Sequence, residues 1–119
     1  KHQDFVEAGH CYIQVASLIW NYLLSTQPDQ YRELEHVIGP VFVQLAPGSN
    51  AHIDWASMEE VSSSPHFCEK GMIAALKKAI YFLKQAEFFE FANELYKVLT
   101  PLYEAAKFAL WLNTSEEAL

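Results

Sequence analysis

The chain has 119 residues, of which 51% are hydrophobic and 14% aromatic, and it carries a formal net charge of −7. This length suits one domain that buries roughly two thirds of its unfolded surface. The single arginine, Arg32, and the scattered lysines exclude the clustered cationic face that a nucleic-acid reader needs, and they disfavour docking to anionic membranes.

The first predicted element is an amphipathic helix of about twenty residues that begins at Asp4. Asp4 and Glu7 have the spacing of a capping box. The helix should end before Pro28, because proline disfavours α geometry in the residue ahead of it. Its apolar positions recur at three- and four-residue spacing: Ala8, Cys11, Val15, Leu18, Ile19, Tyr22 and Leu23.

A shorter second helix is predicted from a cap at Asp29 to a stop at Gly39–Pro40. Residues 41–45 have strand propensity, but an isolated strand has no partner for its backbone groups. We therefore expect an extended stretch that lies over the helices. A turn at 47–50 and one or two helical turns within 53–61 complete an irregular loop in the middle of the chain.

The third predicted helix follows a serine-rich linker. Ser64 and Pro65 have the residue types of an N-cap and a first helical turn. Gly71 costs ~1 kcal/mol relative to alanine inside a helix, which predicts that another helix crosses closely there. The apolar face of this helix consists of Phe67, Met72, Leu76, Ala79, Ile80 and Leu83.

The fourth predicted helix begins near Phe88 and continues past Pro101, which should kink it without breaking it. A tight corner at 85–87 joins it to the third helix as an antiparallel hairpin, which packs against the first helix. Residues 1–119 are thus predicted to form a single all-α domain, an antiparallel array of about four to five helices in the style of tetratricopeptide or armadillo units. The apolar stripe of the last helix consists of Phe89, Ala92, Leu95, Leu99, Leu102, Tyr103, Ala106 and Leu110.

The sequence offers no catalytic, cofactor-binding or metal-binding residue. The nearest approach to a metal motif, His66-x-Cys68, lacks a second pair of ligands. Cys11 and Cys68 are expected to be buried free thiols of a cytoplasmic protein. No apolar run has the length of a membrane span, and no signal peptide precedes the fold. Because the chain starts at Lys1 without methionine, it is interpreted as part of a longer protein.

Aromatic residues are the best candidates for contact with a partner. Phe88, Phe89 and Phe91 span more than one helix face, so they cannot all point into one core. We expect the hairpin of the last two helices to present residues to a second copy of the chain through an isologous contact. The candidates for this dimer interface are Phe88, Phe91, Leu95, Leu99 and Tyr103.

Three segments together resemble the Dock homology region two (DHR-2), the exchange module of DOCK-family Rho guanine nucleotide exchange factors. Residues 5–19 are similar to the opening helix of its first lobe, lobe A. Gly39-x-Val41 is similar to the entry into its irregular loop, which leans toward the zizimin (DOCK-C/D) branch. Residues 93–104 resemble a helix with an internal Leu-x-Pro step. After Lys107 the chain departs from the family, since 108–112 is more apolar than is usual there.

The resemblance implies that this lobe is not catalytic and that it mediates homodimerisation and scaffolding. Two further lobes of the parent protein would bind a Rac- or Cdc42-type GTPase and eject its nucleotide, so no catalytic residue carries over. The parent is expected to be cytoplasmic. The alternative hypothesis is a monomeric tetratricopeptide-like scaffold with a concave groove for a peptide of an unrelated partner.

Overall fold

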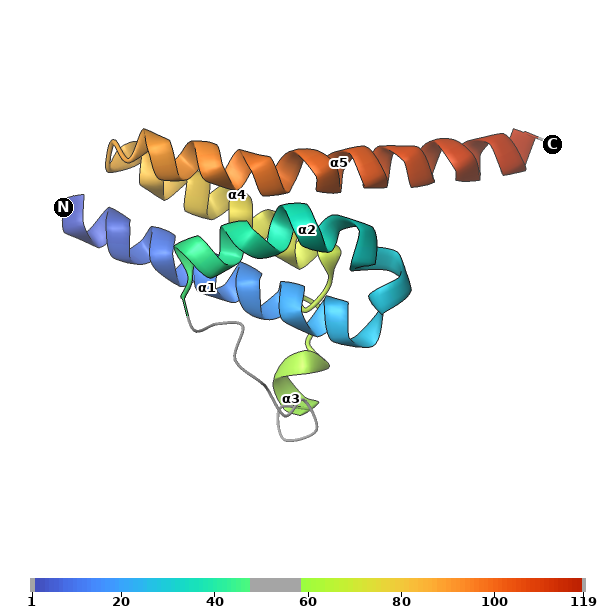
Figure 1. Ribbon diagram of the computed structural model, residues 1–119, viewed down its shortest axis with the longest axis horizontal. Helices are drawn as coiled ribbons and strands as arrows, with labels where there is room; N and C mark the ends of the chain where they lie inside the picture. The colour runs from blue at the N-terminus through green and yellow to red at the C-terminus, as the bar shows by residue number, and fades with distance from the viewer. Residues whose placement is uncertain (1, 48–58, 119) are drawn as a thin grey trace.

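The computed structural model describes the backbone of residues 2–47 and 59–118 and the side chains of residues 4–47, 59–60 and 63–105. The described residues form helices and no strand, so the predicted all-α fold is confirmed. The helices are α1 (His2–Thr26), α2 (Pro28–Leu45), α3 (Glu59–Ser62), α4 (Glu69–Gln85) and α5 (Phe89–Ala118) (Figure 1).

The long helices pack as an antiparallel array that closes on itself. α1 packs against α2 and α4, and α5 packs against the same two helices from the other side. α2 and α4 therefore occupy opposite corners of a bundle, although only the short α3 separates them in the sequence (Figure 1). The C-terminal part of α5 projects beyond the other helices. α5 runs through Pro101 without a break, as predicted.

α2 is longer than the sequence predicts, because Gly39 and Pro40 do not stop it. Part of the conflict between proline and a helical preceding residue comes from that residue's Cβ, which glycine lacks. The continuing turns bury Val41, Phe42 and Leu45 in the core, and the Ala46 amide donates to the Phe42 carbonyl over 2.8 Å. The prediction of an extended stretch at 41–45 is therefore wrong.

The helix starts also differ from the prediction. α1 begins at His2, so Asp4 lies within its first turn and is not the N-cap. α4 begins at Glu69 with Cys68 as its N-cap residue. Ser64 instead forms part of a turn, where its hydroxyl accepts a hydrogen bond from the His66 amide over 3.3 Å. Of the predicted middle loop, residues 48–58 lie outside the described part, and α3 overlaps only the end of the range 53–61 in which helical turns were predicted.

The close helix crossing occurs at Gly9, not at Gly71. A Cβ at Gly9 would lie 3.1 Å from Leu83 Cδ2, so the absence of a side chain lets α1 approach α4. A Cβ at Gly71 would lie 1.7 Å from the His66 carbonyl oxygen. Gly71 therefore accommodates the chain that leads into its own helix, which helical periodicity alone does not reveal.

Candidate interaction surface

The five residues predicted for an interface fall into two groups. Leu95 and Leu99 lie in the core of the single chain, so they are not available on its surface. Phe88, Phe91 and Tyr103 are exposed. The division follows from the position of α5, whose buried stripe packs against α2 and α4.

The outward face of α5 carries an aromatic stripe, of which the prediction named only Tyr103 among the interface candidates. Phe89, Tyr96 and Tyr103 are 55%, 40% and 42% exposed. Their seven-residue spacing is close to two helical turns, so the three rings follow one line along the helix with a drift of about 20° per step. The sequence prediction placed Phe89 and Tyr103 on the apolar stripe of this helix together with the buried leucines, which is wrong for both. The regular spacing was the available signal.

Two lysines of α4 flank this stripe. The Lys84 ammonium donates a hydrogen bond to the Tyr96 hydroxyl over 2.8 Å and lies 5.1 Å from the centroid of its ring. Lys77, two turns earlier, lies 5.1 Å from the Tyr103 centroid. These cation–π contacts restrict the two rings without burying them. Tyr81 lies between the lysines along α4 and is exposed; together with Phe89, Tyr96 and Tyr103 it forms what we term the aromatic ridge.

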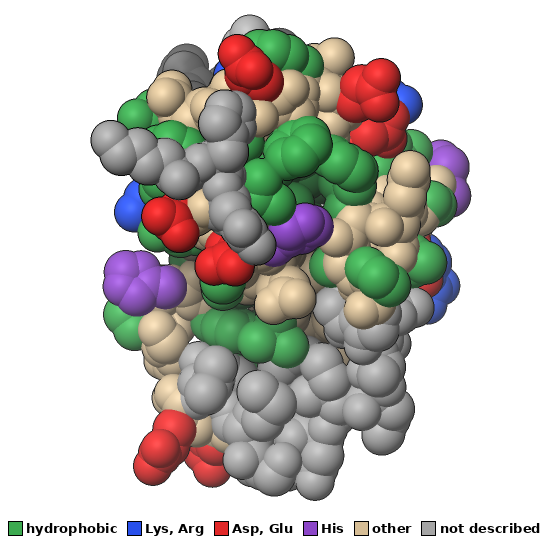
Figure 2. All heavy atoms as spheres, turned by 90° about the vertical axis from the view of Figure 1, so that its left-hand side faces the viewer, with side chains coloured by type: hydrophobic (Ala, Val, Ile, Leu, Met, Phe, Trp, Pro, Cys, Tyr) green, Lys and Arg blue, Asp and Glu red, His purple; other side chains and the backbone are tan. Residues whose placement is uncertain are grey.

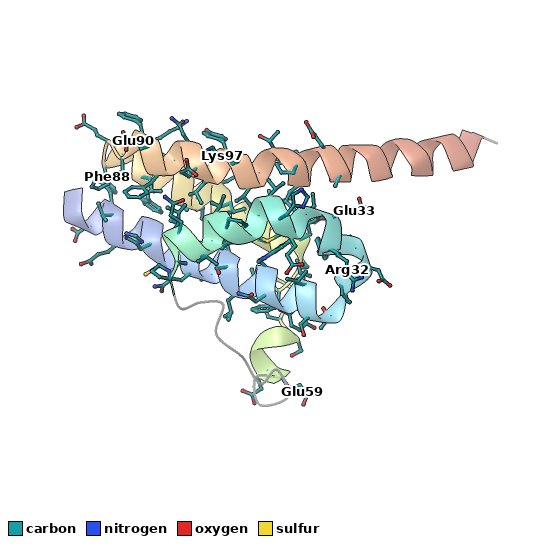
Figure 3. The ribbon with its side chains drawn as sticks, viewed as in Figure 1. Arg32, Glu33, Glu59, Phe88, Glu90 and Lys97 are labelled. Atoms are coloured by element: carbon teal, nitrogen blue, oxygen red, sulfur yellow. The ribbon has the colours of Figure 1, made fainter. Side chains whose placement is uncertain are left out.

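The corner between α4 and α5 adds two further rings to this end of the bundle. The Phe88 amide donates to the Leu83 carbonyl over 2.8 Å and the Glu87 amide to the Lys84 carbonyl over 3.0 Å, which is the Schellman pattern. Phe88 packs edge-on against Phe91, with ring centroids 5.9 Å apart. Figure 2 views this end, where hydrophobic side chains gather among acidic ones, and Figure 3 labels Phe88 and Glu90 at the corner.

A shallow groove of about 480 Å³ lies between α2 and α5. Val37 and Val41 of α2 and Pro101 of α5 provide much of its apolar surface. Lys97 borders the groove and pairs with Glu94 over 2.8 Å. The groove is therefore an apolar channel with a polar margin, and it shares Tyr96 with the aromatic ridge.

Two groups away from these surfaces have shifted pKa values. Burial raises the pKa of Tyr31 to about 12, with smaller contributions from Glu69 and Cys68. Burial also raises the pKa of Glu69, at the start of α4. In both cases a partly apolar environment disfavours the charged form of the side chain. They indicate that Tyr31 and Glu69, near the starts of α2 and α4, belong to a structural cluster and do not form an acid–base pair aimed at a cleft.

The described side chains give little support for metal binding or for thiol chemistry. No group of three or more His, Cys, Asp or Glu residues among them is placed to hold a metal ion. Cys11 is exposed and Cys68 half-buried, so the prediction of two buried thiols is wrong, although both are free. Within the part of the chain that the structure describes, no helix combines the length and apolarity that a bilayer crossing requires.

Comparisons with known proteins identify relatives along nearly the whole chain. The family model described as DHR-2, Lobe A matches residues 1–113. The chain is 28% identical over 117 residues to mouse dedicator of cytokinesis protein 7, covering 96% of this chain and 6% of that protein. It is 28% identical over 108 residues to mouse dedicator of cytokinesis protein 8, covering 88% and 5%. It is 30% identical over 106 residues to mouse dedicator of cytokinesis protein 9, covering 87% and 5%.

The chain therefore corresponds to only about one twentieth of the length of these relatives. No solved structure gives a significant match.

Proposed function

The chain belongs to the DHR-2 lobe A family of DOCK proteins, and from this membership we propose that it is the dimerisation and scaffolding lobe of an exchange factor for Rac- or Cdc42-type GTPases. The observation that carries the dimerisation part is the aromatic ridge. The exchange reaction is assigned to the lobes that complete such a module, and this lobe has no catalytic residue of its own. The parent acts in the cytoplasm.

The composition and position of the ridge support a contact between two copies. Tyrosine and phenylalanine supply large contact areas and are enriched at the centres of protein interfaces. Charged residues form the rim around such a centre. The ridge has this layout, since Lys77 and Lys84 lie beside its rings. A two-fold axis beside Tyr96 and perpendicular to α5 would place α5 antiparallel to its copy, so that each ridge covers the other. Leu95 and Leu99 then act indirectly, by holding α5 in place.

Replacing ridge residues tests the contact. We expect the wild-type chain to have a dimer mass by light scattering at micromolar concentration, and the double substitution Phe89→Ser with Tyr103→Ser to have a monomer mass. Both changes are at exposed positions, so the helical circular dichroism should be retained. Val15→Ser is the matched control, because Val15 is 46% exposed on α1. A monomeric wild-type chain, or equal loss in the control, contradicts the proposal.

The assignment of exchange activity elsewhere is tested separately. The isolated chain should leave the rate of fluorescent GDP release from Rac and Cdc42 unchanged, and stimulation by the chain alone would contradict a non-catalytic lobe.

A second candidate function rests on the groove between α2 and α5. Its apolar walls and polar margin suit an amphipathic peptide of a partner protein. In that case Val37→Arg would abolish peptide binding and leave the mass of the chain unchanged, whereas Phe89→Ser with Tyr103→Ser, at positions outside the groove lining, would affect neither.

A further inference from the structure

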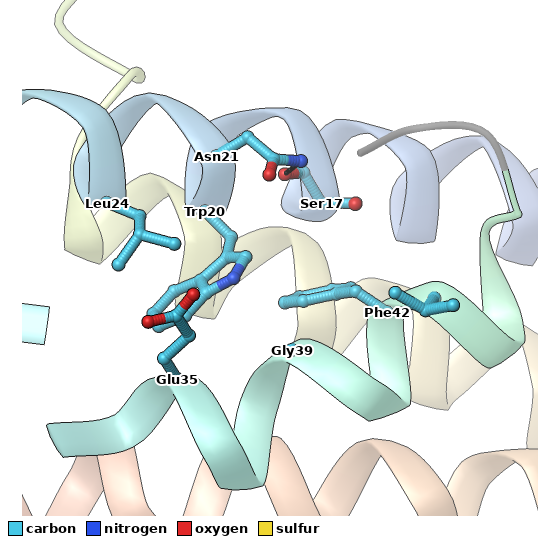
Figure 4. Close-up of a pocket in the computed structure, with 8 residues that line it drawn as sticks. Ser17, Trp20, Asn21, Leu24, Glu35, Gly39 and Phe42 are labelled. Atoms are coloured by element: carbon cyan, nitrogen blue, oxygen red, sulfur yellow. Dashed lines mark hydrogen bonds between the residues drawn. The ribbon is translucent and has the colours of Figure 1, made fainter. Parts of the chain in front are cut away.

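A second recess, between α1 and α2, differs from the groove in size and chemistry. It is a small, partly enclosed pocket of about 150 Å³ (Figure 4). Drug-sized ligands occupy pockets of about 300 Å³ or more, so this one fits the end of a single side chain. Four apolar side chains, three polar ones and one glycine line it: Trp20, Leu24, Phe42 and Val43, then Ser17, Asn21 and Glu35, and Gly39.

The aromatic wall of the pocket is held rigidly by the core. Trp20 is 2% exposed, and its ring centroid lies 6.4 Å from that of Phe42 and 5.9 Å from that of Tyr31. The Tyr31 ring meets it edge-on at 81°. Tryptophan is the strongest cation–π acceptor among the side chains. A cation that enters the pocket would therefore meet a fixed indole and would not have to order one.

The polar part of the lining also favours a positive charge. Glu35 is its only ionisable residue, and it contributes a carboxylate opposite the indole-bearing helix. The Asn21 side-chain amide donates to the Ser17 carbonyl over 2.9 Å, so that donor is used within α1. An anion would find no lysine or arginine among the lining residues. An uncharged guest would desolvate the carboxylate without compensating its charge.

The pocket can be reached from solvent at Gly39. A Cβ built at this position would have Glu35 Cγ, 4.0 Å away, as its nearest neighbour. The space above the glycine is thus open, and the flexible Glu35 side chain borders it. The chain has a net charge of −7, which attracts basic segments before any specific contact forms.

We propose that the α1–α2 pocket binds the ammonium group of a lysine side chain presented by a basic partner peptide. The ammonium pairs with the Glu35 carboxylate beside the Trp20 ring, while the methylene stem passes Leu24 and Val43. This site lies away from the aromatic ridge, so binding here and self-association through α5 are independent of one another.

The test uses the indole N–H signal of Trp20 in an NMR titration of the intact chain. We expect Nα-acetyl-lysine amide to shift this signal saturably, with a dissociation constant in the millimolar range, on the order of what so small a ligand can reach. Nα-acetyl-norleucine amide, which keeps the aliphatic stem without the charge, should not shift it. Methylammonium should bind more weakly than the lysine derivative, because it lacks the stem.

Two charge-neutralising variants separate the pocket from general attraction. Glu35→Gln should weaken lysine binding about five-fold, the upper range for an exposed ion pair. Glu33→Gln removes the same charge from α2 outside the pocket (Figure 3) and should leave binding unchanged. Equal weakening in both variants would overturn the proposal. It would also be overturned if the norleucine derivative shifted the signal equally, if methylammonium bound as tightly as the lysine derivative, or if no shift were saturable.

Discussion

Glu87 adopts a left-handed backbone conformation, with φ of 65°, at the corner between α4 and α5. Residues with a Cβ are disfavoured in this region by about 1–2 kcal/mol, and glycine is the usual occupant of this Schellman position. We expect Glu87→Gly to raise the free energy of unfolding by about 0.5–1 kcal/mol, because glycine also loses more entropy on folding. Chemical denaturation measures this. Glu87→Ala retains the Cβ, and equal stability of the two variants would refute the explanation.

Tyr31 makes stability depend on alkaline pH. Its pKa is about 12 in the folded chain and 10.0 as a free side chain, so the unfolded state loses the proton first. The stability that this difference contributes is complete below pH 10 and is lost as the pH rises toward 12. At ~1.4 kcal/mol per pKa unit, the loss amounts to about 2–3 kcal/mol. Tyr31→Phe should flatten the decline in denaturation midpoint between pH 10 and 12. An unchanged slope would contradict the assignment.

At the scale of the helices, Pro40 lies on the exposed side of a continuous α2. A proline inside a helix removes one hydrogen bond and crowds the preceding turn, and replacing it should recover much of that cost. We expect Pro40→Ala to stabilise the chain by about 1–2 kcal/mol, after allowance for the more flexible unfolded state. Thermal unfolding and helical ellipticity should both increase. Destabilisation would instead indicate that residues 41–45 are extended.

α2 also shows what local sequence patterns cannot predict. The regular spacing of apolar residues in α1, α4 and α5 is a local signal, and it predicts these helices and their antiparallel corner correctly. Gly39–Pro40 is also a local signal, but the burial of Val41 and Phe42 against other helices outweighs it. On α5, Leu95 and Tyr96 are neighbours in sequence, but Leu95 is buried and Tyr96 is exposed. Only the packing of α5 between α2 and α4 decides which stripe faces outward.

For the whole molecule, the closed bundle explains why an aromatic surface remains after the core is complete. The buried faces of α1, α2, α4 and α5 meet in one cluster, so the second stripe of α5 contacts lysines of α4 and stays exposed. Family membership identifies this bundle as a DHR-2 lobe A. We propose that the ridge supplies the contact through which two such lobes are joined, while the α1–α2 pocket remains accessible.

The distance between spin labels in two copies tests this contact most directly. Thr100 lies between Tyr96 and Tyr103 and is exposed; it would be labelled as cysteine in a chain that also carries Cys11→Ser and Cys68→Ser. Packed helices have axes about 8–10 Å apart, so the account predicts a short, narrow distance distribution at Thr100 and a much longer one for a label at Val15. No dipolar coupling between copies, or a shorter distance at Val15 than at Thr100, would contradict it.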